Sequence, residues 1–451
     1  MDAETEAIER ADRSEVVALQ ARQLRALIDR SWARVPFYHR RWEAAGIHPG
    51  AIRTVEDLRR LPIVTKEAFE VDLREHPPFG SYQGDFPVVR IQTSSGTTGE
   101  PKPIAHTRAD WERIAALWER RLRAQGVRAG DRVQIAFTYA LFIVGFSATE
   151  GAMRLDATVI PTGSGAVTPS RRQLEVARAW QSTVLGTTGT YALRLAEVAE
   201  EMGLDPGRDF HFRLMFHTAE PLTPEIRREI ERRWGCRSYD NYGSVETGAP
   251  TYECQQQQGL HISEDAYLVE VVDPETDEPL SPGEEGALVI TSLFKEAAPV
   301  IRFKIGDLAA LWTEPCACGR TFVRMSPVRG RVDEMVKVRG VSLYPSAVES
   351  VLHTFPELGA EWRLVVDRDG ALDRIIVQVE VGGQPEVSEG GELPKRAELT
   401  ARVAARLKER IGLRPEVEIF LPGQLMPRGE VDRRIKGQRV VDRRQASGKE
   451  C

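Results

Sequence analysis

The sequence predicts an α/β protein with a large N-terminal part built on a sheet and a small α+β part at the C-terminal end. Two observations carry this prediction. Short apolar runs alternate with helical patterns between about residues 88 and 330, which is typical of a sheet with helices on its faces. A second, shorter series of strand-like and helical patterns follows after about residue 340. We therefore expect two domains, residues 1–332 and 333–451.

The composition is that of a globular protein and excludes several other classes. The 451 residues include 61 basic and 67 acidic ones, a formal charge of −6, which argues against a nucleic-acid binder that relies on bulk positive charge. Five cysteines do not make a disulfide framework. The N-terminal segment has no apolar core, and the longest uncharged run, Val133–Thr149, contains polar residues. We expect a cytoplasmic protein without nucleic-acid or membrane partners.

The N-terminal part begins with helical patterns over residues 1–60, punctuated by Pro36 and Pro49. Apolar, strand-like runs then follow at 88–94, 132–139, 157–162, 213–219 and 237–243. Helical patterns at 108–125 and 171–180 lie between them. Alternating runs at 266–273 and 287–293 predict antiparallel strands at the end of this part.

The C-terminal part begins near residues 330–340. Its patterns predict, in order, a helix at 345–354, strands at 361–367 and 374–381, a helix at 395–411 and a strand at 416–420. The tail from Met426 to Gln445 holds seven Lys or Arg against three Asp or Glu. Such a tail is ordinarily a solvated surface, but it could also meet an anionic ligand.

A glycine- and hydroxyl-rich segment, TSSGTTGEPK at residues 93–102, follows an apolar strand directly. Glycines let several backbone N–H groups turn toward one anion, hydroxyls add donors, and Lys102 adds charge. Phosphate oxygens are the natural partner of such a set. The segment is not a Walker A loop, because no Gly-Lys-Ser/Thr closes it. The alternative is a flexible surface loop.

This segment resembles the phosphate loop of the adenylate-forming superfamily, and more narrowly of its phenylacetate–CoA ligase branch. The resemblance covers almost the whole chain. Its further motifs are Val35–Tyr38, Leu61–Lys66, Ala219–Pro221, Tyr242–Thr247, Gly259–His261, Gly306–Asp307, Gly330–Asp333, Arg339–Gly340 and Lys436–Asp442. It implies a large AMP-binding domain with mixed and parallel sheets plus a β subdomain, followed by a small mobile domain.

The resemblance also assigns a nucleotide site. The residues expected along the β- and γ-phosphates are Ser95, Gly96, Thr97, Thr98, Gly99 and Lys102. Those expected at adenine are Tyr242, which stacks on the base, its neighbours Asn241 and Gly243, and Ala219, Glu220 and Pro221. Asp307 would accept from the ribose hydroxyls beside Arg331, and Glu246 would hold Mg²⁺, which prefers carboxylate oxygen. The family's aromatic-Arg-Thr-Gly-Asp string is Phe-Lys-Ile-Gly-Asp here, so only its Gly-Asp end is retained.

Four residues are implied in a two-step cycle in which the small domain rotates. Asp333 stands at the hinge, while Lys337 and Gly340 lie on the face that meets the pocket in the second step. Lys436 would bridge the substrate carboxylate and the α-phosphate in the first step. The surrounding segment is several residues longer than the family's usual one, but no other lysine lies between Lys408 and Lys449.

A metal site is predicted from three cysteines and a histidine. Cys316 and Cys318 form a Cys-x-Cys pair, and Cys254 and His217 come from distant segments. Three thiolates and one imidazole suit a closed, structural Zn²⁺ site. His261 is an alternative fourth ligand. The competing interpretation is reduced cysteines in a turn and a histidine satisfied elsewhere.

The resemblance implies an acid pocket after the strand at 132–139, where Tyr139 and Phe142 would provide aromatic walls suited to a flat ring. The alternative is that these residues are ordinary core. Gly243 would also border the pocket. The function implied is ATP- and Mg²⁺-dependent activation of an aryl or arylacetic acid to acyl-AMP, with release of pyrophosphate and transfer to coenzyme A. An amine, a hydroxyl or a carrier-protein thiol is the alternative acceptor. A catalytically silent nucleotide-binding protein is the alternative from another class. The resemblance further implies a homodimer.

Overall fold

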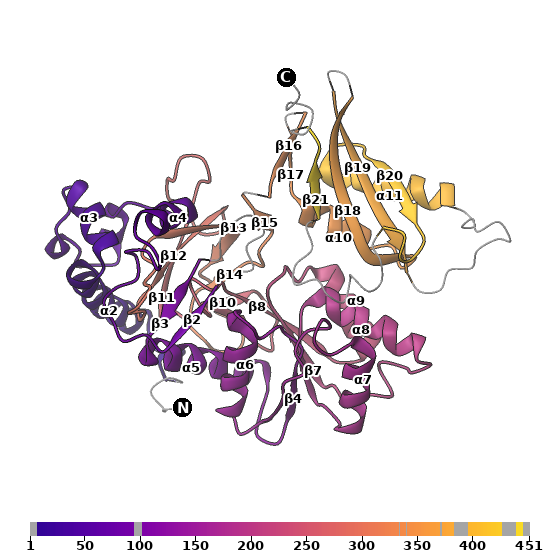
Figure 1. The fold of residues 1–451 in the computed structure, drawn as a ribbon, viewed down its shortest axis with the longest axis horizontal. Helices are drawn as coiled ribbons and strands as arrows, with labels where there is room; N and C mark the ends of the chain where they lie inside the picture. The colour runs from indigo at the N-terminus through magenta and orange to yellow at the C-terminus, as the bar shows by residue number, and fades with distance from the viewer. Residues whose placement is uncertain are drawn as a thin grey trace.

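The computed structural model describes residues 7–93, 102–332, 334–339, 341–369, 372–382, 396–425 and 439–444. Figure 1 shows N-terminal helices at one end of the molecule, a large sheet with helices through its middle, and a separate C-terminal sheet with its own helices. The mixed α/β fold class predicted from the sequence is confirmed.

The N-terminal helices form a layer beside the antiparallel end of the sheet. Their bounds are α2 (Arg13–Arg34), α3 (Pro36–Ala44), two 3₁₀ turns (Pro49–Ala51 and Glu56–Arg60) and α4 (Lys66–Glu75). Helix α2 buries one apolar stripe that includes Leu24, Leu27 and Ile28. Pro36 stands at the first position of α3, where its missing N–H costs no helical hydrogen bond.

The large sheet combines parallel strands at one end with antiparallel strands at the other. The order of its main path is β11-β12-β13-β14-β10-β9-β8-β7-β6-β4-β5, and β1 and β15 pair with β13. The parallel strands are β4 (Arg132–Ile135), β5 (Thr158–Ile160), β6 (Val184–Gly186), β7 (Leu214–His217) and β8 (Arg237–Tyr242). The others are β1 (Val64–Thr65), β9 (Thr251–Glu253), β10 (Leu260–Ile262), β11 (Tyr267–Val272), β12 (Glu285–Ser292), β13 (Phe303–Trp312), β14 (Arg324–Met325) and β15 (Gly330–Arg331).

Helices cover both faces of the parallel strands, and the alternation of side chains along each strand explains why. Leu214 and Phe216 of β7 join the core cluster that contains residues of α5 and α6, whereas Met215 between them joins the cluster of α7, α8 and α9. The helices are α5 (Arg108–Gln125), α6 (Ile143–Met153), α7 (Ser170–Ala179), α8 (Gly189–Glu201) and α9 (Pro224–Trp234).

The C-terminal part has its own sheet, of order β20-β19-β18-β21, and its own hydrophobic core. Its elements are β16 (Val336–Val338), β17 (Val341–Leu343), α10 (Pro345–Leu352), β18 (Leu358–Asp369), β19 (Leu372–Val381), α11 (Arg396–Ile411), β20 (Glu416–Phe420) and β21 (Val440–Asp442). It packs against the N-terminal part at α9, where Ser350 Oγ donates to Glu225 at 2.9 Å. The domain boundary at residues 332 and 333 stays a prediction, because Asp333 lies outside the described residues.

The predicted elements correspond to observed ones with shifted ends. The strand expected at 88–94 is regular only over β2 (Arg90–Gln92), which pairs with β3 (Ile104–His106) in a separate two-stranded sheet. A strand with a single partner has few hydrogen bonds to extend it. Among the described residues, no helix combines the length and apolar character that a membrane span requires.

Candidate active site

The carboxyl ends of the parallel strands bring several predicted site residues to one edge of the sheet. Tyr139 follows β4, Ala219–Pro221 follow β7, and Tyr242 ends β8. These three strands run in the same direction, and ligands of open α/β sheets bind at this edge. The fold therefore places these candidate nucleotide and acid residues at one edge of the sheet.

Tyr242, Asp307 and Arg331 form one hydrogen-bonded group. The Tyr242 hydroxyl donates to Asp307 Oδ2 at 2.6 Å, and Arg331 Nη1 donates to Asp307 Oδ1 at 2.8 Å. Asp307 and Arg331 are paired residues of β13 and β15. Burial and the neighbouring carboxylate raise the pKa of Tyr242 well above its usual value, so the phenol keeps the proton that it donates. The structure thus joins three residues that the sequence assigned to adenine and ribose.

The turn after Tyr242 carries Glu246 toward Lys102. Gly243 is required in this turn, because a Cβ there would lie 2.2 Å from the carbonyl oxygen of Gly248. Lys102 Nζ lies 3.6 Å from Glu246 Oε1 and 4.0 Å from Glu70 Oε1, and its side chain is 5% exposed. Burial lowers the pKa of Lys102, and Glu246 opposes that shift. A cation and a carboxylate thus meet beside the segment predicted to bind phosphates.

The remaining adenine candidates lie at the same edge, with mixed roles for their side chains. Asn241 is held from both sides, since its Nδ2 donates to the His217 carbonyl at 3.2 Å and its Oδ1 accepts from Gln125 at 2.8 Å. The Glu220 carboxylate accepts from Thr190 N at 2.6 Å, in the first turn of α8, so it caps that helix. The Glu220 carboxylate is therefore engaged with α8, while the backbone of Ala219–Pro221 stays the candidate for contact with the base.

Tyr139 and Phe142 lie in the turn that precedes α6. Their turn is closed by Phe142 N donating to the Tyr139 carbonyl at 2.9 Å. The Tyr139 hydroxyl lies 2.9 Å from Thr149 Oγ1, and its ring packs edge-on against Phe146 with centroids 5.1 Å apart. Both rings are half-buried. Their role as walls of an acid pocket stays a prediction.

Several predicted residues lie outside the described residues. They are Ser95, Gly96, Thr97, Thr98, Gly99, Asp333, Gly340 and Lys436. Lys337 lies in β16, which pairs with β17. Arg439, three residues after Lys436, donates to the carbonyls of Ala360 and Trp362 and pairs with Glu361 at 3.1 Å. The chain downstream of Lys436 is therefore anchored on β18.

Sequence reasoning missed two buried cations behind this site. Lys295 is fully buried and its Nζ donates to the Glu246 carbonyl at 2.7 Å. Arg121 is 1% exposed and its Nη2 donates to the Tyr242 carbonyl at 2.9 Å. Burial lowers the pKa of Lys295 to about 8 and that of Arg121 to about 9. The sequence shows only that Lys295 and Glu296 stand between the mostly apolar run at 286–294 and Ala-Ala-Pro-Val at 297–300.

Three thiols and one imidazole form a compact cluster between β9, β10 and the turn after β13. The candidate ligand atoms of Cys254, His261, Cys316 and Cys318 all lie within 4.8 Å of one another. Cys254 and Cys316 sulfurs are 3.8 Å apart, and Cys318 Sγ is 3.4 Å from His261 Nε2. A tetrahedral Zn²⁺ with ordinary bond lengths has S···S edges of about 3.8 Å and S···N edges of about 3.5 Å. The donor set and its spacing fit a structural zinc.

The fourth member of this cluster is the alternative, His261, rather than His217. His217 is buried at the end of β7 and its Nδ1 lies 3.0 Å from the Thr187 carbonyl. Burial lowers the pKa of His217 to about 4, so it is neutral there. His261 belongs to β10, which pairs with β9 directly before Cys254. Strand pairing, which spacing along the chain does not reveal, decides between the two histidines.

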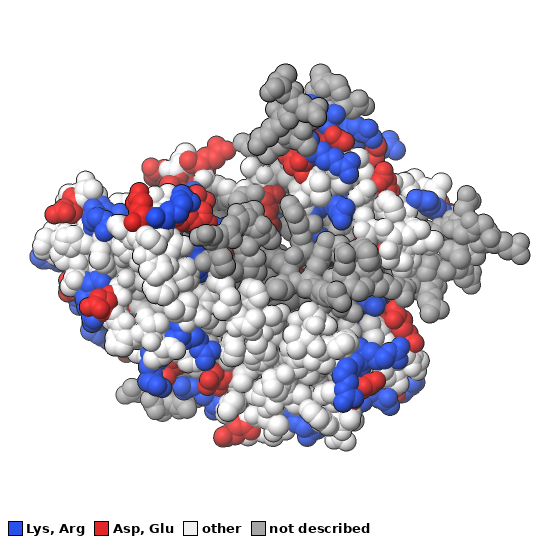
Figure 2. All heavy atoms as spheres, viewed as in Figure 1, with Lys and Arg blue, Asp and Glu red and all other residues white. Residues whose placement is uncertain are grey.

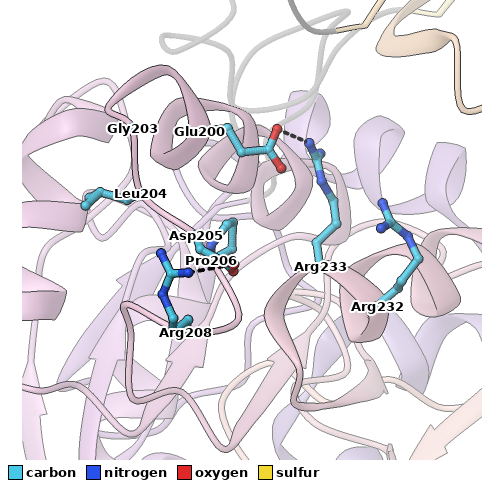
Figure 3. Close-up of a pocket in the computed structure, with 8 residues that line it drawn as sticks. All are labelled: Glu200, Gly203, Leu204, Asp205, Pro206, Arg208, Arg232 and Arg233. Atoms are coloured by element: carbon cyan, nitrogen blue, oxygen red, sulfur yellow. Dashed lines mark hydrogen bonds and ion pairs between the residues drawn. The ribbon is translucent and has the colours of Figure 1, made fainter.

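Oppositely charged residues form ion pairs elsewhere on the surface. A surface pocket near the ends of α8 and α9 contains three arginines (Figure 3). Arg233 pairs with Glu200 at 2.6 Å and Arg208 lies 3.8 Å from Asp205. No predicted site residue lines this pocket. Figure 2 shows basic and acidic residues interspersed over the visible face.

Comparisons with known proteins agree with the motifs. The family model for AMP-binding enzymes matches residues 17–294, and the model for the AMP-binding enzyme C-terminal domain matches residues 340–444. A phenylacetate-coenzyme A ligase of Thermus thermophilus is 38% identical over 97% of this chain and 98% of its own length. A phenylacetate-coenzyme A ligase of Escherichia coli is 36% identical over 98% of both. The chain belongs to the family of AMP-binding enzymes, and the resemblance inferred from its motifs is confirmed.

Solved structures add information on how the two parts are arranged. A 2-hydroxyisobutyryl-CoA ligase in the postadenylation state has a TM-score of 0.88 at 29% identity, covering 98% of this chain and 92% of that one. The same ligase in its thioesterification state scores 0.71, with 97% of this chain and 91% of that one covered. Both are states of one protein, and the present structure is more similar overall to the first. The present arrangement resembles the postadenylation state.

Proposed function

We propose that this protein activates an aryl or arylacetic acid with ATP to give acyl-AMP and pyrophosphate, and then transfers the acyl group to coenzyme A. The protein is an adenylate-forming acid–CoA ligase, a class supported by its family and by full-length relatives that carry the name phenylacetate-coenzyme A ligase. The aromatic character of the acid is our inference from those names and from Tyr139 and Phe142.

The observation that carries the proposal is that two groups of residues meet where β8 ends and in the turn that follows it. Tyr242, Asp307 and Arg331 are joined by hydrogen bonds of 2.6 and 2.8 Å, and Lys102 lies 3.6 Å from Glu246. The first group offers an aromatic face and a carboxylate, which suit a nucleoside. The second offers a cation and a metal-binding carboxylate, which suit a polyphosphate with its Mg²⁺.

In the first step, a carboxylate oxygen attacks the α-phosphate and the bond to pyrophosphate breaks. Both reactants are anions, so catalysis requires positive charge where they meet. We assign Lys436 to the reacting oxygens, and Lys102 with the segment 95–99 to the departing phosphates. Mg²⁺ held by Glu246 would offset further negative charge on the phosphates. Asp307 and Tyr242 orient the nucleoside.

In the second step, a thiol attacks the acyl carbonyl and AMP leaves. We assign Asp333 as the hinge that turns the C-terminal part between the steps, and Lys337 and Gly340 to the face presented to the thiol. This second step is supported by the similar 2-hydroxyisobutyryl-CoA ligase, whose structures hold acyl-AMP alone in one state and acyl-AMP with CoA in another.

The test is a screen of acids and acceptors read by mass spectrometry. With an aryl or arylacetic acid and ATP, we expect pyrophosphate and enzyme-bound acyl-AMP without any acceptor, and acyl-CoA once coenzyme A is added. Reactions without acid are the control. No pyrophosphate with any acid would contradict the proposed activity. Acyl-AMP that persists in the presence of coenzyme A would instead point to an amine, a hydroxyl or a carrier-protein thiol as acceptor.

We also propose that Cys254, His261, Cys316 and Cys318 bind one structural Zn²⁺. Their spacing supports a closed tetrahedral site, and a shell of four protein ligands leaves no position for substrate. The cluster joins β9, β10 and the turn after β13. A zinc ion there would stabilise the antiparallel strands next to the nucleotide site and take no part in the reaction.

A further inference from the structure

Segment 242–246 runs from Tyr242 to Glu246. It carries Tyr242 and Gly243, which are proposed to contact the nucleotide, and Glu246, the proposed magnesium ligand. Its two ends are held by different buried cations through backbone carbonyls. Arg121 Nη2 donates to the Tyr242 carbonyl at 2.9 Å, and Lys295 Nζ donates to the Glu246 carbonyl at 2.7 Å. Side-chain positions of Tyr242 and Glu246 depend on where these carbonyls are fixed.

The two cations are unusual because their charge is not paired locally. Lys295 is 0% exposed and Arg121 1% exposed, yet among the described residues neither has a carboxylate within ion-pair distance. Arg121 instead lies over the Trp118 ring, 4.3 Å from its centroid. Burying an unpaired charge is costly, so a neutral residue of similar shape would suit a purely structural core better.

Helix α5 supports both cations. Near its N-terminus, Asp110 accepts from Glu296 N at 2.7 Å and from Ala297 N at 3.2 Å, which fixes the loop that carries Lys295. Near its C-terminus the same helix carries Arg121 itself. One rigid helix therefore sets the separation between the two held carbonyls.

We propose that Arg121 and Lys295 are positioning residues that hold the two ends of segment 242–246, and so align the ring of Tyr242 and the carboxylate of Glu246 for MgATP. This inference rests on the proposed function. In this proposal, neither Arg121 nor Lys295 touches the nucleotide. Lys295 acts through Glu246, 3.6 Å from Lys102, and Arg121 acts through Tyr242, 2.6 Å from Asp307.

The test compares Lys295→Met with Lys295→Arg and with a matched control, Arg324→Met. Arg324 is also a buried cation that donates to backbone carbonyls, those of Gln258 and Glu314, but it lies in β14, away from segment 242–246. The measurements are KM and kcat for ATP in pyrophosphate release, MgATP affinity by calorimetry, and thermal unfolding.

For Lys295→Met we expect a KM for ATP and a calorimetric Kd for MgATP raised at least fivefold, because a hydrogen bond from a charged group is lost. Lys295→Arg should restore both values to within threefold of the wild type. Arg324→Met should lower the unfolding temperature without moving either value. Lys295→Gln, with a donor too short to reach the carbonyl, replaces Lys295→Met if that variant does not fold.

A folded Lys295→Met or Lys295→Gln variant whose MgATP affinity changes less than fivefold overturns the inference. Failure of the wild type to release pyrophosphate with any acid counts against the proposed function instead. Calorimetry of MgATP binding still reads the positioning role in that case, so the two failures are distinguishable.

Discussion

At the scale of single residues, the nucleotide candidates divide into those with a sequence signature and those without. Tyr242, Glu246 and Asp307 stand in short motifs with a glycine at a fixed place, and the structure supplies the reason for one of these glycines. A Cβ at Gly243 would collide with the Gly248 carbonyl. Arg121 and Lys295 have no such signature, because a cation that donates to a distant backbone carbonyl leaves no pattern along the chain.

Asp307 should be needed for nucleotide affinity. Asp307→Ala removes the acceptor of both Tyr242 and Arg331, and we expect the KM for ATP to rise about tenfold or more, as for loss of charged hydrogen bonds. The measurement is pyrophosphate release against ATP concentration. Asp205→Ala, at an exposed carboxylate in the distant surface pocket, is the control. An unchanged KM would remove Asp307 from the site.

Lys436 should be needed for the first step only. Lys436→Ala should slow acyl-AMP formation on the order of a hundredfold, as expected when a group that offsets charge in the transition state is lost. The rate of acyl-CoA formation from added acyl-AMP should stay near that of the wild type. Lys408→Ala, at an exposed lysine of α11, is the control. A full rate of acyl-AMP formation would mean that another residue fills this role.

At the scale of elements, helices with a regular apolar pattern were predicted well from the sequence, whereas the pairing of strands was not predicted. Helix 395–411 is observed at 396–411 because its apolar stripe, with Val403 and Leu407, is long and regular. The histidine nearest the three cysteines depends instead on β9 pairing with β10, a contact between segments that the sequence does not specify. Strand pairing also explains why the strand expected at 88–94 is regular only over Arg90–Gln92, because its length depends on its partner strand.

The two histidines should differ in metal binding. We expect about one zinc per chain in protein purified without chelator, retained in His217→Asn and lost or strongly reduced in His261→Asn, because only His261 lies among the thiols. The measurement is atomic emission or mass spectrometry of the purified proteins. Loss of the metal should also lower the unfolding temperature, since metal binding contributes to folding free energy. Wild-type protein without zinc would contradict the site.

At the scale of the whole molecule, the proposed two-step reaction depends on how the N-terminal and C-terminal parts are arranged relative to each other. The contact between α10 and α9 joins the parts in an arrangement that resembles the postadenylation state of a related ligase. The sequence predicted two parts from two successive series of strand and helix patterns, but not their orientation, which involves contacts between distant segments such as Ser350 with Glu225. Those contacts carry no periodic pattern.

Weakening this contact should slow the first step and spare the second. Ser350→Ala removes a hydrogen bond of 2.9 Å to Glu225, and we expect acyl-AMP formation to fall about threefold, in line with a hydrogen bond to a charged group on the interface. Acyl-CoA formation from added acyl-AMP should not fall. Thr354→Ala, which removes a bond to the Val351 carbonyl within the C-terminal part, is the control. Equal slowing of both steps would argue against a role in orientation.

The location of the nucleotide decides the account as a whole. A crystal structure with Mg²⁺ and a non-hydrolysable ATP analogue measures it most directly. We predict phosphates along residues 95–99 and Lys102, adenine on Tyr242 and the ribose hydroxyls on Asp307. An analogue bound elsewhere, with Tyr242 and Asp307 free of it, would contradict the assignment of the active site.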